Sequence, residues 1–81
     1  MTTYRVPVAD DLLLERDAWN SVKGFRLVSV DGPWPSHRGV TICTFEDDGA
    51  PAELEGKLVE PVIKREEDGT VRIIERSVVT W

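Results

Sequence analysis

The sequence has few of the residues from which most catalytic and metal sites are built. It has one cysteine, Cys43, and one histidine, His37, among 81 residues. That pair cannot supply the usual four ligands of a zinc site, and a single cysteine cannot form an internal disulfide. The chain also lacks the patterns GxGxxG and GxxxxGKS/T, which bind dinucleotides and phosphates. We therefore expect a protein that is not an enzyme, with no cofactor, no metal and no catalytic residue.

Long hydrophobic runs and an excess of positive charge are also missing. The longest aliphatic run is Leu12–Leu14, whereas a membrane span needs about 20 apolar residues. The N-terminus shows no secretory signal, and with a single cysteine this predicts a reduced, cytoplasmic protein. Ten Lys and Arg against 15 Asp and Glu give a net charge of -5, which argues against non-specific nucleic-acid binding. Arg outnumbers Lys and Val outnumbers Ile, a bias typical of a GC-rich genome such as that of an actinobacterium or one of its phages.

Two weak patterns of catalytic or metal-binding type have simpler interpretations. Cys43 and His37 could form a thiolate pair, but Cys43 lies within an apolar strand-like run and His37 in the loop before it. We interpret Cys43 as core packing. Asp47-Asp48-Gly49 resembles a fragment of a calcium loop, but the other ligands of an EF-hand are absent, so we interpret it as an acidic turn.

Several runs rich in β-branched residues predict strands. They cover residues 25–30, 40–45, 57–64 and 70–80, and Tyr4–Val8 could add a short edge strand. Pro61 has no N–H for a β-ladder, which predicts an edge or a bulge there. The apolar face of the last run changes between Ile73 and Ile74, which predicts a bulge or a strand buried on both sides. Three Asp-Gly pairs, at 31–32, 48–49 and 68–69, are typical of tight hairpin turns. The hairpin from Lys57 to Val79 closes at Glu66–Gly69.

One segment has helical periodicity. Leu14, Ala18 and Val22 are four residues apart, with Trp19 beside them on the predicted core side. Asp10 or Asp11 could cap the start, and Gly24 stands where a left-handed residue would end the helix. The spacing predicts a helix over residues 11–23. The fold class is then α+β: one short N-terminal helix with an antiparallel sheet of four or five strands, or a small, partly open β-barrel of the SH3-like or OB-like kind. We expect a single domain over 1–81, with an N-terminal arm over 1–10 and a β-rich core over 25–81.

The negative charge is confined to one segment. Residues 1–45 and 61–81 each sum to zero, so the whole net charge of -5 comes from 46–60. A solvated segment that maintains solubility is one interpretation. The other is an acidic patch that steers association with a partner. Its candidate residues are Glu46, Asp47, Asp48, Glu53 and Glu55.

The loop over residues 32–39 is the second unusual feature. Trp34 stands between Pro33 and Pro35, and His37 and Arg38 follow it. A Trp on a proline-restricted backbone loses little entropy on binding, and Trp and Arg are common interface anchors. The alternative is that Trp34 packs back against the domain as a core residue. The same question applies to Trp81.

These features favour a small non-enzymatic protein-interaction module. Trp34, His37 and Arg38 would form one contact patch and the acidic residues a second. An alternative is a structural subunit of a homo-oligomeric assembly, for example in a phage particle, marked by an unpaired strand edge near Pro61 or Tyr4–Val8. A weak single-stranded nucleic-acid binder ranks third. Arg72 and Arg76 are predicted on one strand face, but the neighbouring acidic residues favour ion pairs on a solvated face over a nucleic-acid groove. The expected partner is another protein or a copy of the same chain, with no membrane.

Overall fold

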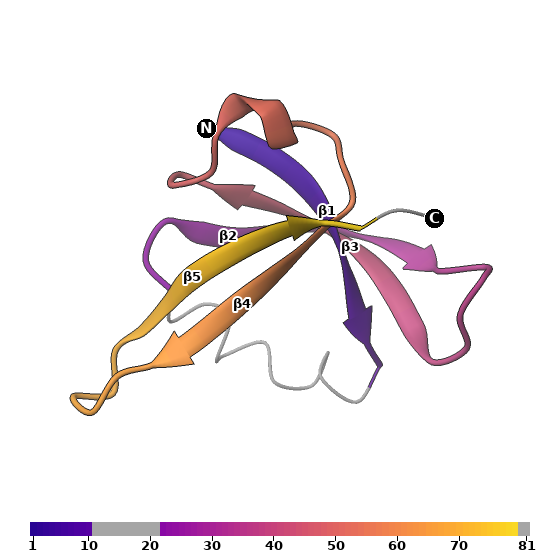
Figure 1. Ribbon diagram of the computed structural model, residues 1–81. Helices are drawn as coiled ribbons and strands as arrows, with labels where there is room; N and C mark the ends of the chain where they lie inside the picture. Colours follow the sequence, from indigo (N-terminus) through magenta and orange to yellow (C-terminus); the bar gives the residue numbers. More distant parts are fainter. Residues whose placement is uncertain (11–21, 80–81) are drawn as a thin grey trace.

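The computed structural model of the protein describes residues 1–10 and 22–79 (Figure 1). The described chain is rich in β-structure with almost no helix, and every predicted strand is present. The elements are β1 (Thr2–Ala9), β2 (Phe25–Pro33), β3 (Val40–Asp47), the short 3-10 helix η2 (Ala52–Leu54), β4 (Val59–Arg65) and β5 (Val71–Val78).

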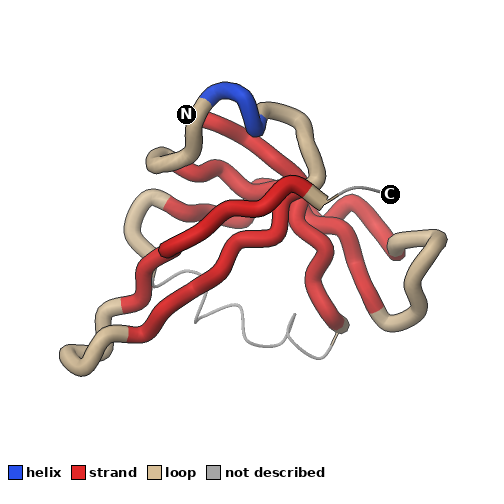
Figure 2. The backbone as a smooth tube through the Cα atoms, viewed as in Figure 1, coloured by secondary structure: helices blue, strands red, loops and turns tan. Residues whose placement is uncertain are grey.

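The strands form two antiparallel sheets rather than a barrel (Figure 2). One sheet has the order β1-β3-β2, and the other is the hairpin β4-β5. Within the described residues the strands do not close on themselves, so the prediction of a small β-rich domain is confirmed only in its coarse form. The alternative of an SH3-like or OB-like barrel is not found there.

Alternate residues of β1 and β3 build the main core. Tyr4 pairs with Phe45 and Val6 with Cys43 in the antiparallel register, and all four side chains are buried. Alternate residues of a strand point to the same face, so these pairs form one apolar surface. Phe25 of β2 stacks on Phe45, with ring centroids 4.4 Å apart. The hairpin covers this surface with Val59 and Val71, its two buried side chains.

The predicted hairpin from Lys57 to Val79 and its turn at Glu66–Gly69 are confirmed. Glu66 N–H donates to the Thr70 carbonyl at 2.7 Å, and the Asp68 side chain accepts from Thr70 N–H at 2.9 Å. Gly69 has φ +88°, a conformation that favours glycine. The register shifts at Ile74, opposite Val62 and Ile63, so the predicted bulge is present.

The turn predicted at Asp31-Gly32 is not where the chain reverses. Asp31-Gly32 was expected to reverse the chain, but it lies inside β2, where two register shifts occur. The reversal follows it, over residues 34–39.

The predicted helix over 11–23, with Trp19, falls almost entirely on residues outside the described part of the chain, as does Trp81. Residues 22 and 23 lie in a turn, and Gly24 has the predicted positive φ, +75°.

A short segment before β4 joins the two sheets. Arg5 N–H donates to the Lys57 carbonyl at 2.9 Å, and Gly56 N–H donates to the Thr3 carbonyl at 2.8 Å. Val79 N–H in turn donates to the Leu58 carbonyl at 2.8 Å. Residues 56–58 therefore bridge the edge of β1 and the base of the hairpin. Among the described residues, no helix has the length and hydropathy of a membrane span.

Candidate functional site

The loop between β2 and β3 is held by its own backbone. Trp34 N–H donates to the Val40 carbonyl at 2.9 Å, and His37 N–H donates to the Trp34 carbonyl at 3.1 Å. Gly39 has φ +73° and leads the chain into β3. Two prolines flank the tryptophan and restrict φ on either side of it. The loop is therefore preorganised.

Trp34 lies inside the molecule, which corrects the expectation of an exposed indole. Only 9% of its surface is accessible, and it packs in a small second cluster with Ile42 and Leu58. The alternation of β3 explains this position, because Ile42 points to the face opposite Cys43 and needs an apolar cover there. The alternative interpretation of Trp34, as a residue that packs back against the domain, is the one found in the structure.

His37 and Arg38 are the solvent-facing residues of the predicted loop patch. The imidazole of His37 stacks on the buried indole of Trp34, with ring centroids 3.9 Å apart and an interplanar angle of 20°. Both His37 and Arg38 are exposed. Within residues 1–10 and 22–79, Arg38 has no salt-bridge partner. The loop thus displays the His37 imidazole on an aromatic base, with the Arg38 guanidinium beside it in the sequence.

The acidic segment divides into internal and external carboxylates. Glu46 is half-buried and pairs with Arg26 of β2 at 2.8 Å, and Asp47 is buried. Asp47 is therefore a correction to the predicted exposed patch, whereas Glu46 stays at the surface in an exposed ion pair with Arg26. The carboxylates that remain exposed belong to Asp48, Glu53 and Glu55. Glu55 also accepts a hydrogen bond from Thr3 N–H at 2.6 Å, at the edge of β1.

Asp47 is the centre of a buried polar network that sequence reasoning missed. Its carboxylate accepts from the Tyr4 hydroxyl at 2.5 Å, from Arg76 Nε at 2.5 Å and Nη2 at 3.0 Å, and from Gly49 N–H at 3.0 Å. The arginine reaches it in a two-point contact, the strongest form of an Arg–carboxylate pair. β1, β3 and β5 therefore meet at one carboxylate.

The network shifts the ionisation of both acids in it. Burial by itself raises the pKa of Asp47, but the hydrogen bonds and charge of Arg76, with the Tyr4 hydroxyl, outweigh it and hold that pKa below its usual value. Burial raises the pKa of Tyr4 well above its usual value, and the hydrogen bond to Asp47 raises it further. At neutral pH the network is a phenol, a carboxylate and a guanidinium, an arrangement suited to stabilising the fold.

The two predicted patches lie at opposite ends of the three-stranded sheet. The loop over 34–39 enters β3 at Val40, and the acidic turn leaves it at Asp47. The seven steps from Val40 to Asp47, at about 3.4 Å each, separate the ends by about 24 Å. The structure therefore keeps the Arg38 loop and the Asp48–Glu55 segment as separate surfaces, one at each end of β3.

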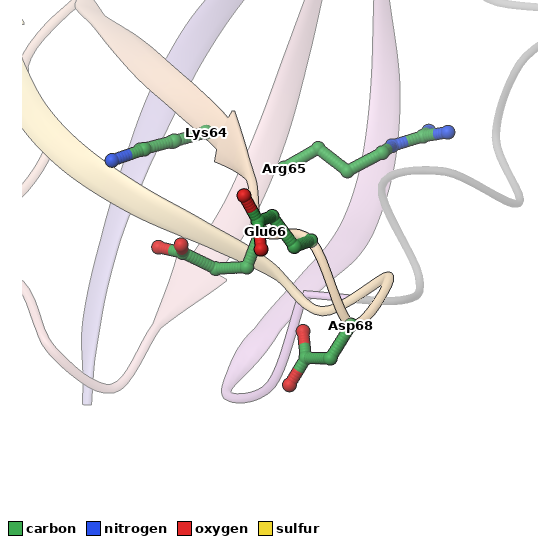
Figure 3. Close-up of a pocket in the computed structure, with 5 residues that line it drawn as sticks. Lys64, Arg65, Glu66 and Asp68 are labelled. Carbon is green, nitrogen blue, oxygen red and sulfur yellow. The ribbon is translucent and has the colours of Figure 1, made fainter.

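The tip of the hairpin forms an open concavity lined by residues 64–68 (Figure 3). Lys64 and Arg65 point to opposite sides of the strand, and Glu66 pairs with Arg72 at 2.7 Å. The expected ion pair on a solvated face is thus present. Arg76, however, does not share the face of Arg72, because the bulge at Ile74 turns it inward to Asp47.

The remaining candidates for chemistry are not assembled in the described part of the chain. Cys43 is fully buried in the core, whereas His37 is exposed at the loop. No group of three or more His, Cys, Asp or Glu that could hold a metal ion occurs in residues 1–10 and 22–79. Comparison with known proteins returns no matching family model, no matching curated protein and no matching solved structure.

Proposed function

We propose that the protein is a non-enzymatic interaction module that binds a carboxylate-bearing segment of a partner protein through the β2–β3 loop. The observation that carries this proposal is the stack of His37 on Trp34. It fixes the exposed ring at the surface, in a loop with two internal backbone hydrogen bonds. Arg38 stands next to it, exposed and without a salt bridge in the described residues.

The chemistry of the two groups selects the partner. A guanidinium donates to a carboxylate in a two-point contact, and an imidazole N–H adds a further donor. Because the loop is preorganised, little conformational entropy is lost on binding. The buried Trp34 supports the loop from beneath, so its role in the proposal is positioning rather than direct contact.

Selection of random displayed peptides on the wild-type protein tests this proposal. We expect the selected peptides to be enriched in Asp and Glu, and Arg38→Ala to weaken their binding at least about tenfold, as for a moderate interface anchor. Arg65→Ala is the matched control, because Arg65 is an exposed arginine on the distant hairpin. Peptides that bind Arg38→Ala as tightly as the wild type would contradict the proposal.

A subunit of a homo-oligomeric assembly is the second candidate function. One specific observation favours it: β4 pairs only with β5, and its other edge, which β1 meets at the bridge between Arg5 and Leu58, has no partner strand from Pro61 onward within residues 1–10 and 22–79. An unpaired edge can be completed by a strand of another chain.

A further inference from the structure

The backbone groups of β4 alternate between the hairpin partner and the open edge. Leu58 accepts from Val79 N–H on the β5 side, and Glu66 N–H donates to Thr70 across the same hairpin. The register of β4 has no inserted residue between these positions. Even-numbered residues therefore direct their N–H and C=O groups toward β5. Odd-numbered residues, Pro61, Ile63 and Arg65 among them, direct theirs toward the open edge.

The other edges are closed or distorted. β1 gives its outward groups at Thr3 and Arg5 to residues 56 and 57, and Pro7 has no N–H to offer. β2 carries two register shifts, and β5 carries the bulge at Ile74. Bulges and prolines are the devices by which edge strands avoid pairing. The edge of β4 meets β1 only at its start, through the bridge between Arg5 and Leu58. From Pro61 to Arg65 it is regular and unpaired in the described part of the chain, and Pro61 removes one donor from it.

The outer face of β4 is complementary to itself. Glu60, Val62 and Lys64 are exposed on that face, and Val62 retains 41% of its accessible surface. If two β4 strands lie antiparallel about a two-fold axis at Val62, residue 60 of one copy stands opposite residue 64 of the other. Each Glu60 then faces the Lys64 of the other copy, so the dimer contains two such pairs. The two Val62 side chains face each other on the axis. Shifting the axis to residue 61 or 63 loses both of these opposite-charge pairs.

We propose that two copies of the chain associate through β4, antiparallel, with the two-fold axis at Val62, so that the two hairpins form one four-stranded sheet. Ile63 N–H donates to the Pro61 carbonyl of the second copy, which uses the one backbone group that Pro61 keeps on that edge. Pairing of this kind is isologous and closes at two copies. The missing Pro61 donor and the small contact make it a weak, reversible dimer. This inference deepens the assembly proposal and is independent of the Arg38 loop.

Sedimentation velocity across concentrations up to about 1 mM tests the association. Three variants test the register: Glu60→Lys, Lys64→Glu and the double exchange Glu60→Lys/Lys64→Glu. Each single variant sets two like charges opposite each other, and we expect the dimer dissociation constant to rise at least about tenfold. The double exchange restores both opposite-charge pairs and the wild-type constant. A mixture of the two single variants should form a heterodimer, because every Lys then faces a Glu.

The control variant is Glu53→Lys, which makes the same charge change on η2, away from β4. It should dimerise like the wild type, and circular dichroism should show all variants folded. A wild-type protein that stays monomeric up to about 1 mM would overturn both the dimer and the assembly proposal. If the wild type and both single variants dimerise with the same dissociation constant, the Val62 register is overturned and the assembly proposal stands. Neither result bears on peptide binding by Arg38.

Discussion

The three-stranded sheet and the hairpin obtain their stability in different ways. The sheet is buried on both faces at β3, where Ile42 packs on one side and Cys43 on the other. The hairpin is covered on one face only, and its outer side chains Val62 and Ile74 are exposed. A two-stranded hairpin is at best marginally stable by itself. The hairpin therefore depends on its contacts with the sheet. These are the buried side chains of Val59 and Val71 and the ion pair of Arg76 with Asp47.

Two arginines on the same strand show this difference. The side chains of the Arg76–Asp47 pair are 21% and 3% exposed, whereas those of the Arg72–Glu66 pair are 62% and 35% exposed. The first pair joins the two sheets, and the second lies within the hairpin. Solvent weakens an exposed ion pair, but a buried one cannot lose a partner without leaving a charge inside the protein. The predictions below change residues at the Arg76–Asp47 junction and compare the resulting losses in the free energy of unfolding.

Arg76→Ala should have the largest effect. It leaves the Asp47 carboxylate buried without its cation, which costs about 3 kcal/mol in the free energy of unfolding, near the lower end of the range for a broken buried pair. Arg72→Ala, the matched control on the same strand, should cost at most about 1 kcal/mol. Urea unfolding followed by tryptophan fluorescence measures both. Equal losses for the two variants would contradict the division into an anchoring and a local pair.

Acid and alkali should each weaken the same junction. The pKa of Asp47 is lowered in the fold, so its contribution to stability is complete above the unfolded value of about 3.9 and is lost as the pH falls through the lower folded value. Asp31 and Asp68, whose pKa values are lowered by hydrogen bonds from Thr44 and from Thr70, add to this acid loss. The pKa of Tyr4 is raised, so its contribution is complete below about 10 and is lost as the pH rises above that value.

The free energy of unfolding, measured at a series of pH values, checks both limits. We expect a plateau between about pH 5 and pH 9, with losses on either side. In Tyr4→Phe the alkaline loss should be smaller, because no phenol ionises on unfolding. An unchanged alkaline loss in that variant would show that another group causes it.

Tyr4→Phe at neutral pH should have an intermediate effect. The ring still packs against Phe25, at a centroid distance of 6.4 Å, while Asp47 loses one donor. A hydrogen bond to a charged group contributes about 1.5–3 kcal/mol. The loss in urea unfolding should fall in that range, below that of Arg76→Ala. A neutral result would mean that water replaces the hydroxyl at the carboxylate.

Gly49→Ala should have the smallest effect on the junction. Gly49 does not have a positive φ, but a Cβ there would lie 2.9 Å from Arg76 Nη2. The guanidinium must move, which weakens its second contact with Asp47 at a cost of about 1 kcal/mol. In an Arg76→Lys background this Nη2 atom is absent, so the same substitution should cost less. A double-mutant cycle of unfolding free energies measures the difference, and additive losses would refute the contact.

The strands could be predicted because their signals are local. Runs of β-branched residues, the Asp68-Gly69 turn and the change of face at Ile73-Ile74 each lie within a few residues of the structure they specify. The turn predicted at Asp31-Gly32 is wrong because the same dipeptide also suits a bulged strand. Whether it forms a turn or a bulge depends on its pairing with β3. The pattern predicts the bulge at Ile74, but alternation alone puts Arg72 and Arg76 on one face, whereas the extra residue in the bulge moves Arg76 to the other.

The candidate site was less predictable because burial depends on distant contacts. Asp47 continues the alternation of Cys43 and Phe45, which was a signal that its side chain points inward. Its partners, however, lie 43 residues before it and 29 residues after it, and no local pattern joins them. Trp34 likewise packs on Ile42 and Leu58, the latter far along the chain. The exposure of His37 and Arg38 agrees with the predicted loop, but their binding role is still a proposal.

The network around Asp47 also sets an order of events during synthesis of the chain. The ribosome makes Tyr4 first, Asp47 next and Arg76 29 residues later. At a translation rate of about 5–20 residues per second, Arg76 is synthesised about 1.5–6 s after Asp47. During that interval the nascent three-stranded sheet has no counter-charge for Asp47 and no cover on its core face from β4 and β5. Co-translational folding of the domain can therefore finish only after the last strand has emerged.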